Sequence, residues 1–159
     1  MDDSGKFSHV DASGKASMVD VSGKPRVKRT ARAACSVLMA PATAELIRAN
    51  VMAKGDVLAT ARVAGIMAGK KAAELIPLCH TIEIDRIAVE LSVGADRVDI
   101  ESLAVCVDRT GIEMEALTAA SVAALTVWDM CKAVDKGLRV DGLRLLSKTK
   151  EAAEPGRVC

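Results

Sequence analysis

The chain has 159 residues, half of them hydrophobic, and this length predicts a single domain with its own core. Its formal net charge is +1 at pH 7, so it has no overall field that would attract nucleic acid or an anionic membrane. Phe7 and Trp128 are the only aromatic residues, so aliphatic side chains must fill the core. We expect part of this aliphatic surface to be buried by assembly of several copies.

Residues 1–26 are rich in Ser, Gly, Asp and Lys without sustained periodicity, which predicts a mobile or loosely docked arm with Met18–Ser22 as its ordered part. The first residues lack the basic and apolar regions of a signal peptide, and no run of 18 apolar residues occurs. We therefore expect a soluble, cytoplasmic protein. The run Lys24–Arg32 holds five basic residues and is either a solvated arm or a local anion site.

The first regular elements expected are a strand over Ala34–Met39 and a helix that Thr43 caps, continuing to about Val51. Asp56 is a candidate N-cap for a second helix over Val57–Leu75, whose many alanine and glycine residues allow a neighbour to approach closely. Pro77 then ends regular structure and opens a loop.

Two segments that follow, Arg86–Val93 and Arg97–Asp108, alternate apolar with polar or small residues and predict antiparallel strands. Gly94-Ala95-Asp96 between them predicts the hairpin connection. A long apolar helix lies within Thr110–Gly137, where Gly137 ends it.

A final strand over Leu138–Ser147 and a frayed tail over residues 149–159 complete the chain. The order of strand, two helices, two strands, helix and strand predicts an α+β fold. We expect a mainly antiparallel sheet with helices covering one face, similar to a ferredoxin-like βαββαβ unit with an added helix. No internal repeat or second domain is visible, so residues 1–159 form one domain.

The long helix is nearly all apolar, yet Glu113 and Glu115 stand at its start and Asp129 and Lys132 at its end. With about 1.5 Å of rise per residue, Glu115 and Asp129 are roughly 21 Å apart along the helix axis and on one face. One small pocket cannot hold both. Either the two ends serve separate sites, or a second copy of the chain brings its own helix end alongside, which predicts an oligomer with shared active sites.

Each charged group also has a structural interpretation. The helix dipole stabilises Glu113 and Glu115 at an N-terminus, and Asp129 and Lys132 could form a plain ion pair. If that pair is partly buried, the proton affinity of each group depends on the other, which suits proton transfer. Lys54, just before a helix, is either a solvated turn residue or a ligand-facing cation.

His80 is either hydrogen-bonded to a carbonyl or a titrating group of a site. The cysteines are odd in number and contain no CxxC pair, so neither a disulfide framework nor a zinc site is expected, and the thiols should be reduced. No nicotinamide motif or P-loop is present, and we expect no metal and no cofactor.

Four long motifs stand in order along the chain: MVDVS (18–22), KGDVLATARVAGIMAGKKAAELIPLCH (54–80), TGIEMEALTAASVAALTVWDMCKAVDKG (110–137) and GLRLLSK (142–148). With them, about residues 8–148 closely resemble the molybdenum cofactor biosynthesis protein C family, the cyclic pyranopterin monophosphate synthases. Two positions depart from the family pattern: Thr81 replaces a usual proline after His80, and Val27 replaces a usual threonine near Arg29.

The resemblance implies a lyase-type synthase with this same fold. Its substrate would be 3′,8-cyclo-7,8-dihydroguanosine 5′-triphosphate, which is rearranged into cyclic pyranopterin monophosphate with release of pyrophosphate. The resemblance also implies a homohexamer, a trimer of dimers with active sites at subunit interfaces. It assigns catalysis to Asp129, the principal acid/base residue, and to Lys132, and makes Lys54 a substrate-binding or catalytic lysine. To these catalytic residues we add His80 as a second group that moves protons. The resemblance assigns substrate binding to Leu78, Cys79, His80, Glu113, Met114, Glu115 and Arg29.

Two other functions stay open at this point. The chain could be a different pterin- or nucleotide-processing enzyme on the same fold, which turnover of GTP itself would reveal. It could also be a non-catalytic, oligomeric partner-binding protein, in which case Asp129 and Lys132 would be replaceable without loss of function.

Overall fold

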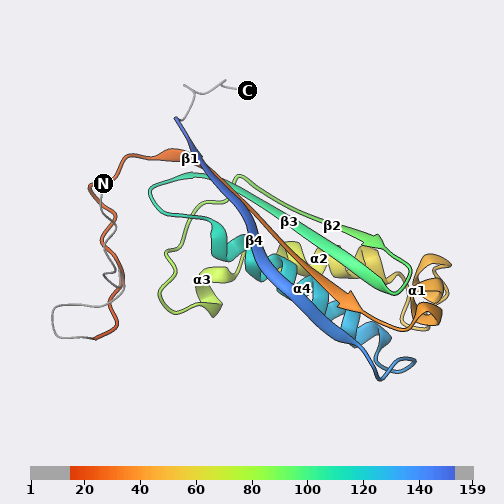
Figure 1. The fold of residues 1–159 in the computed structure, drawn as a ribbon. Coiled ribbons are helices and arrows are strands. Elements are labelled where there is room, and N and C mark those ends of the chain that lie inside the picture. The colour runs from red at the N-terminus through yellow and green to blue at the C-terminus, as the bar shows by residue number, and fades with distance from the viewer. Residues whose placement is uncertain (1–14, 153–159) are drawn as a thin grey trace.

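The computed structural model describes residues 15–152 of the chain. Its four strands form one antiparallel sheet in the order β2-β3-β1-β4, and Figure 1 shows α2 and α4 lying across the same face of this sheet. The predicted α+β, ferredoxin-like fold with helices on one face is therefore confirmed. The elements are β1 (Val27–Leu38), α1 (Pro41–Arg48), α2 (Val57–Gly69), α3 (Ala72–Leu75), β2 (Arg86–Val93), β3 (Arg97–Asp108), α4 (Glu113–Cys131) and β4 (Arg139–Glu151).

The hairpin of β2 and β3 has the bounds that the alternation of its residues predicts. Val93 pairs with Val98 next to the turn, and Arg86 pairs with Val105 at the open end. The β3 residues that face the helices, such as Val98 and Ile100, are almost fully buried, whereas their neighbours on the other face are not. This period of two fixes the register, because a slip by one residue would turn the apolar set to solvent.

Strands β1 and β4 are longer than predicted. β1 begins at Val27 instead of Ala34, and β4 continues to Glu151, so Thr149–Glu151 belong to the sheet and not to a frayed tail. Lys28, Arg29 and Arg32 therefore lie in a strand and not in a solvated arm. The reason is that β1 is hydrogen-bonded to β3 on one side and β4 on the other, which local charge cannot reveal. Residues 1–14 of the expected arm and 153–159 of the expected tail lie outside the described range.

The predicted start of α1 is wrong. The helix begins at Pro41 with Ala40 as N-cap, and no side chain caps it locally. Thr43 is buried, and its hydroxyl donates to Oδ2 of Asp135 at 3.0 Å, while the backbone N–H of Ala40 donates to the same oxygen at 2.7 Å. A carboxylate distant in sequence thus satisfies the start of the helix, which a local capping rule does not detect.

The other helix ends agree in part with the sequence. Asp56 caps α2 as predicted, because its Oδ1 accepts the backbone N–H of Ala59 at 2.9 Å. The prediction of a single helix over Val57–Leu75 is wrong, because the helix is interrupted at Lys70 and Lys71, between α2 and α3. The long helix, α4, ends at Cys131 and not at Gly137.

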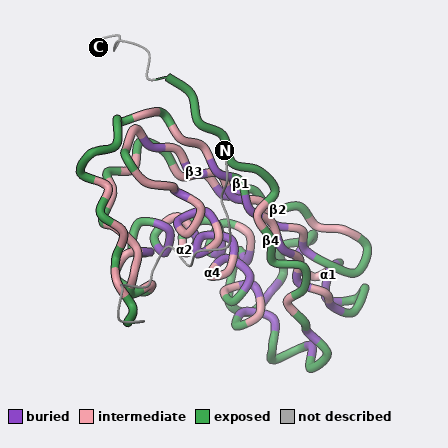
Figure 2. The backbone as a smooth tube through the Cα atoms, turned by 60° about the vertical axis from the view of Figure 1, so that its left-hand side comes forward, coloured by how far each residue is buried: buried purple, intermediate pink, exposed green. Residues whose placement is uncertain are grey.

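Close packing of α4 forms the centre of the core. The five alanines Ala116, Ala119, Ala120, Ala123 and Ala124 are each 0% exposed, and Figure 2 shows the buried positions gathered between the sheet and the helices. Gly65 of α2 leaves so little room that a Cβ there would lie 2.7 Å from the carbonyl oxygen of Ala119. Small residues therefore bring α2 and α4 into near backbone contact.

We expect Gly65→Ala to destabilise the protein by about 1–2 kcal/mol. Overpacking a tight core costs about 1–3 kcal/mol, and alanine recovers at most about 1 kcal/mol through its helix propensity. Urea unfolding measures the difference. The matched control is Gly23→Ala, which meets no atom within 4 Å and should change stability by less than about 0.5 kcal/mol. A Gly65→Ala variant more stable than the natural protein would contradict this packing.

Candidate functional site

A lysine–aspartate cluster lies at the C-terminal end of α4. Asp129 accepts a hydrogen bond from Nζ of Lys132 on Oδ1 at 2.5 Å and another from Nζ of Lys54 on Oδ2 at 2.8 Å. All three side chains are about half exposed. The structure therefore brings together three of the four predicted catalytic residues, from α4 and from the loop before α2.

The turn before α2 directs Lys54 toward α4. The backbone N–H of Gly55 donates to the carbonyl of Met52 at 2.9 Å, and Gly55 has φ of 90°, which favours glycine. Lys54 also donates to the backbone carbonyl of Asp129 at 2.9 Å. Although Lys54 precedes α2 in the sequence, its ammonium group lies at the C-terminal end of α4, where the helix dipole favours positive charge.

The two lysines keep Asp129 ionised. Hydrogen bonds from Lys132 and Lys54, followed by their positive charges, lower the pKa of Asp129 to about 2. A carboxylate with this pKa holds no proton near neutral pH. In the free chain Asp129 is therefore a strong acceptor of hydrogen bonds and a weak base, and removal of either ammonium would make it a stronger base.

A second group of predicted residues surrounds a pocket of about 480 Å³ at the other end of α4, which we name the arm pocket. The N-terminal arm, the loop after α3 and the start of α4 each form part of its wall. It contains every residue of the predicted Leu-Cys-His and Met-Glu motifs. The lining residues are Val19, Val21, Lys24, Ile76, Leu78, Cys79, His80, Thr110, Gly111, Glu113, Met114 and Glu115.

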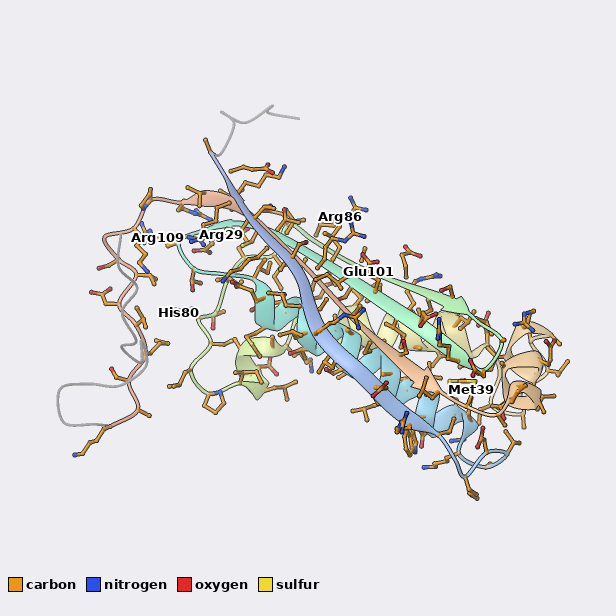
Figure 3. The ribbon with its side chains drawn as sticks, viewed as in Figure 1. Arg29, Met39, His80, Arg86, Glu101 and Arg109 are labelled. Carbon is orange, nitrogen blue, oxygen red and sulfur yellow. The ribbon has the colours of Figure 1, made fainter. Side chains whose placement is uncertain are left out.

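His80 ties the arm to this pocket. Its Nε2 lies 2.8 Å from the carbonyl oxygen of Val19, a geometry in which the ring N–H donates. Figure 3 shows His80 on the loop between α3 and β2, on the side where the arm runs past. The carbonyl partner that sequence reasoning left open is thus present, and it belongs to the MVDVS motif. Lys24 was not predicted as a residue of this pocket, although it stands two positions after that motif.

Glu115 is the buried acid of the arm pocket. It is 3% exposed, and its Oε2 has no hydrogen-bond partner within the described range. Burial raises the pKa of Glu115, its own backbone N–H partly opposes this shift, and the charge of Glu113 adds to it. Cys79 in the same wall has its pKa raised by burial and by the charges of Glu115 and Glu113, so it is a thiol at neutral pH. A buried, unpaired carboxyl in a pocket wall is suited to accept a hydrogen bond from a ligand.

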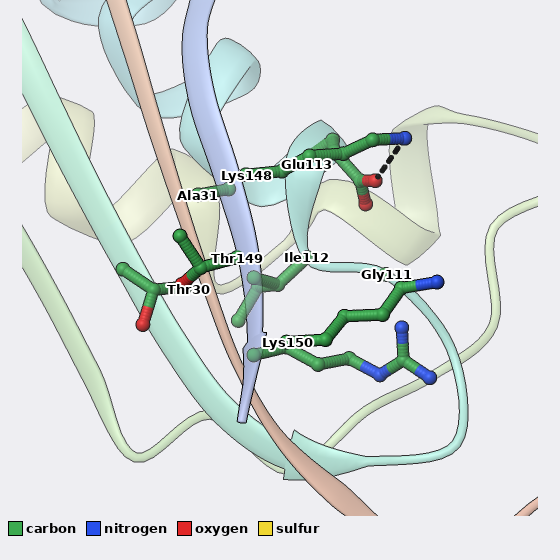
Figure 4. A pocket seen from close by; sticks show the side chains of 9 residues that line it. Thr30, Ala31, Gly111, Ile112, Glu113, Lys148, Thr149 and Lys150 are labelled. Carbon is green, nitrogen blue, oxygen red and sulfur yellow. Dashed lines mark ion pairs between the residues drawn. The ribbon is translucent and has the colours of Figure 1, made fainter. Parts of the chain in front are cut away.

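A smaller pocket of about 280 Å³, the basic pocket, adjoins the arm pocket, and Gly111 and Glu113 line both. Lys148 of β4 reaches across it to Glu113, with 3.3 Å between Nζ and Oε1, as the dashed line in Figure 4 marks. Lys148 was missed as a site residue, although it ends the GLRLLSK motif. The lining residues are Arg29, Thr30, Ala31, Gly111, Ile112, Glu113, Lys148, Thr149 and Lys150.

Arg29 lines the basic pocket, but its guanidinium also supports the chain before α4. Its Nε donates to the carbonyl of Asp108 and its Nη2 to the carbonyl of Arg109, both at 2.9 Å. Figure 3 shows Arg29 and Arg109 together at one end of the sheet. Arg29 therefore holds the segment that leads into Glu113. It also stands in the pocket wall, and its substrate contact stays a prediction.

Two general features complete the description. Within residues 15–152, no group of three or more His, Cys, Asp and Glu side chains is placed to hold a metal ion. No helix in that range combines the length and the apolar character needed to cross a membrane.

Fold and site together define an α+β protein of the ferredoxin-like class, with charged groups around pockets of small-molecule size. The model of the MoaC family matches residues 18–151, and the chain belongs to that family. Three relatives are each named cyclic pyranopterin monophosphate synthase. The relative from Chloroflexus aggregans is 52% identical over 145 residues, which cover 90% of this chain and 88% of the relative. The one from Streptomyces coelicolor is 53% identical over 149 residues, with 94% and 88% covered. The one from Desulforamulus reducens is 52% identical over 145 residues, with 91% and 88% covered.

We expect Glu115→Gln to change how stability depends on pH. In the natural protein the raised pKa of Glu115 means that the folded state keeps a proton that the unfolded state releases above about pH 4.5. Folding stability therefore falls as the pH rises from that value through the folded pKa, and the glutamine variant lacks this fall. Urea unfolding from pH 4 to 8 should show the variant gaining stability relative to the natural protein toward higher pH. The exposed Glu74→Gln serves as control, and parallel curves for Glu115→Gln would contradict the burial of an unpaired acid.

Proposed function

We propose that the chain is a cyclic pyranopterin monophosphate synthase. It converts 3′,8-cyclo-7,8-dihydroguanosine 5′-triphosphate into cyclic pyranopterin monophosphate and pyrophosphate, a step of molybdenum cofactor biosynthesis. Membership in the MoaC family supports this assignment. The observation that carries the mechanism is the ionised Asp129 held between the ammonium groups of Lys54 and Lys132.

The lysine–aspartate cluster changes its chemistry when a polyanion binds. Phosphate oxygens compete with Asp129 for the ammonium groups of Lys54 and Lys132, both of which are exposed enough to be reached. When either lysine turns to phosphate, the pKa of Asp129 rises from about 2 toward its usual value of 3.8. Binding of the triphosphate thus converts Asp129 into a stronger base at the place where protons must move, and the lysines stabilise the charge that develops on phosphate.

The arm pocket receives the other part of the substrate. His80 and Glu115 line it with an imidazole ring and a carboxyl for a ligand with polar edges, and Leu78 and Met114 add apolar side chains to the same wall. Because the substrate is a ring system that carries a triphosphate, it needs both a pocket with hydrogen-bonding groups and a cationic end. The arm pocket supplies the hydrogen-bonding groups, whereas the lysine–aspartate cluster that carries the proposed proton transfer lies at the opposite end of α4.

A second copy of the chain resolves this separation, and we assign it to the free edge of β4. This strand ends the sheet order β2-β3-β1-β4, so its outer backbone groups are unpaired by the sheet. Leu143 is 48% exposed and Leu146 44% exposed on it. A two-fold axis beside β4 and perpendicular to α4 makes the two α4 helices antiparallel, so that the start of one lies next to the end of the other.

One flank of α4 fits this arrangement. Met114, Ser121, Leu125, Trp128 and Lys132 are separated by seven, four, three and four residues, which places them along a single stripe of the helix. The stripe faces away from α2, since α2 meets Ala119 and Ala123 through Gly65. It joins the arm pocket at Met114 to the cluster at Lys132, and Leu125 between them is 60% exposed. Dimers paired in this way, three to a hexamer, form the proposed assembly.

We expect Asp129→Asn and Lys132→Ala each to lower product formation by at least about a hundredfold while the protein stays folded, because a positioned acid/base group contributes about 10²–10⁴-fold. The measurement is turnover of the cyclised nucleotide triphosphate, with circular dichroism as the test of folding. Matched controls are Asp96→Asn in the β2–β3 hairpin and Lys70→Ala after α2, which remove the same charges elsewhere. Natural turnover in either cluster variant would contradict the mechanism, and turnover of GTP without turnover of the cyclised nucleotide would overturn the function.

A mixture of two inactive chains tests the shared site. In Lys132→Ala the cluster is damaged and the arm pocket is intact, and in His80→Ala the reverse holds. Co-production of the two chains in equal amounts should restore about a quarter of natural activity, because half of the dimers are mixed and each has one intact site. Separately purified chains that are mixed without subunit exchange are the control. A mixed sample as inactive as its components would show that one chain forms the whole site.

A further inference from the structure

Gly111 lies two residues before Glu113 and in the wall between the two pockets. Both Gly111 and Glu113 line the arm pocket and the basic pocket. The described chain has no other residue in both linings. Whatever fixes the Glu113 side chain therefore decides how its charge is presented to either pocket.

The backbone does not require glycine at this position. Among the described glycines, only Gly55 and Gly142 have positive φ, at 90° and 65°. Gly111 therefore has a conformation that alanine adopts without strain. The reason for glycine must lie in the space around its Cα.

The carboxylate of Glu113 occupies that space. A Cβ on Gly111 would lie 1.8 Å from Oε2 and 2.6 Å from Cδ of Glu113. Oε1 of the same carboxylate pairs with Nζ of Lys148 at 3.3 Å. Figure 4 shows the Glu113 and Lys148 side chains meeting beside Gly111. Because Gly111 has no side chain, the Glu113 carboxylate has room to lie where it pairs with Lys148 of β4.

We infer that Gly111 is a positioning residue that acts through Glu113. It allows the carboxylate to fold back against the main chain, between the two pockets and within reach of Lys148. An alanine there moves only the end of a flexible side chain, so the fold survives while the carboxylate is displaced. This inference rests on the proposed function and on the substrate-binding role that the family resemblance implies for Glu113.

A double-mutant cycle tests the inference, with Gly111→Ala, Glu113→Ala and the combined variant. We expect Gly111→Ala to lower kcat/KM for the cyclised nucleotide triphosphate by about tenfold or more at an unchanged thermal midpoint. In the Glu113→Ala background the same change should alter kcat/KM by less than about twofold, because its target is already absent. The control is Gly137→Ala, whose Cβ would meet only Oδ1 of Asp135 at 3.4 Å and should leave kcat/KM unchanged.

Equal losses from Gly111→Ala in both backgrounds would overturn the inference, because glycine would then act without Glu113. Natural kcat/KM in Gly111→Ala, with activity lost in Glu113→Ala, would overturn it as well and leave the proposed function intact. A crystal structure of Gly111→Ala gives a readout independent of turnover. We expect the Glu113 carboxylate to have left Lys148, and an unchanged pair would overturn the inference even if the proposed substrate were wrong.

Discussion

The close packing of α4 against α2 and the sheet is the constraint on which the rest of the molecule depends. A row of alanines without exposed surface, opposed by Gly65 and Gly69, holds the helix in near backbone contact with its neighbours. Such an interface leaves no room for rotation or sliding, because a shift of one position would place Cβ atoms against carbonyl oxygens. The two charged ends of α4 are therefore fixed in direction and separation, and neither can move to meet the other.

The two ends place their carboxylates in opposite environments. Glu115 is buried with an oxygen that no described group pairs, and burial raises its pKa. Asp129 is exposed and has two ammonium partners, which lower its pKa to about 2. Glu115 therefore lacks a hydrogen-bond partner, which a ligand can provide. Asp129 has two ammonium partners, for which the phosphates of a ligand can compete. In the proposed assembly, a single molecule with hydrogen-bond donors at one end and phosphates at the other would contact Glu115 of one chain and Asp129 of the next, and would bring the pKa of each closer to its usual value.

Local pattern predicted the parts of the fold whose causes are local. The β2–β3 hairpin follows from alternation and its glycine turn, and the N-cap of α2 follows from Asp56. The misses have distant causes: Asp135 satisfies the start of α1, and pairing with β1 extends β4 to Glu151. The site divides in the same way. The resemblance indicated the residues, but neither it nor the spacing could show that Lys54 contacts Asp129, 75 positions away. Nor could they show that the Glu113 carboxylate occupies the space beside the Cα of Gly111.

The lysine–aspartate cluster is half exposed in the single chain, so a second copy of the chain could cover it and complete the site. A half-exposed ion pair is solvated and contributes little to stability, so the cluster can exchange partners at small cost. The same three charges, once covered by a ligand and a neighbouring subunit, lose that solvation and interact more strongly, because the effective dielectric falls. In the single chain, α4 holds the cluster open to solvent. If a neighbouring subunit and a ligand cover it in the proposed assembly, strong interactions among its three charges would arise only in the complex that holds substrate.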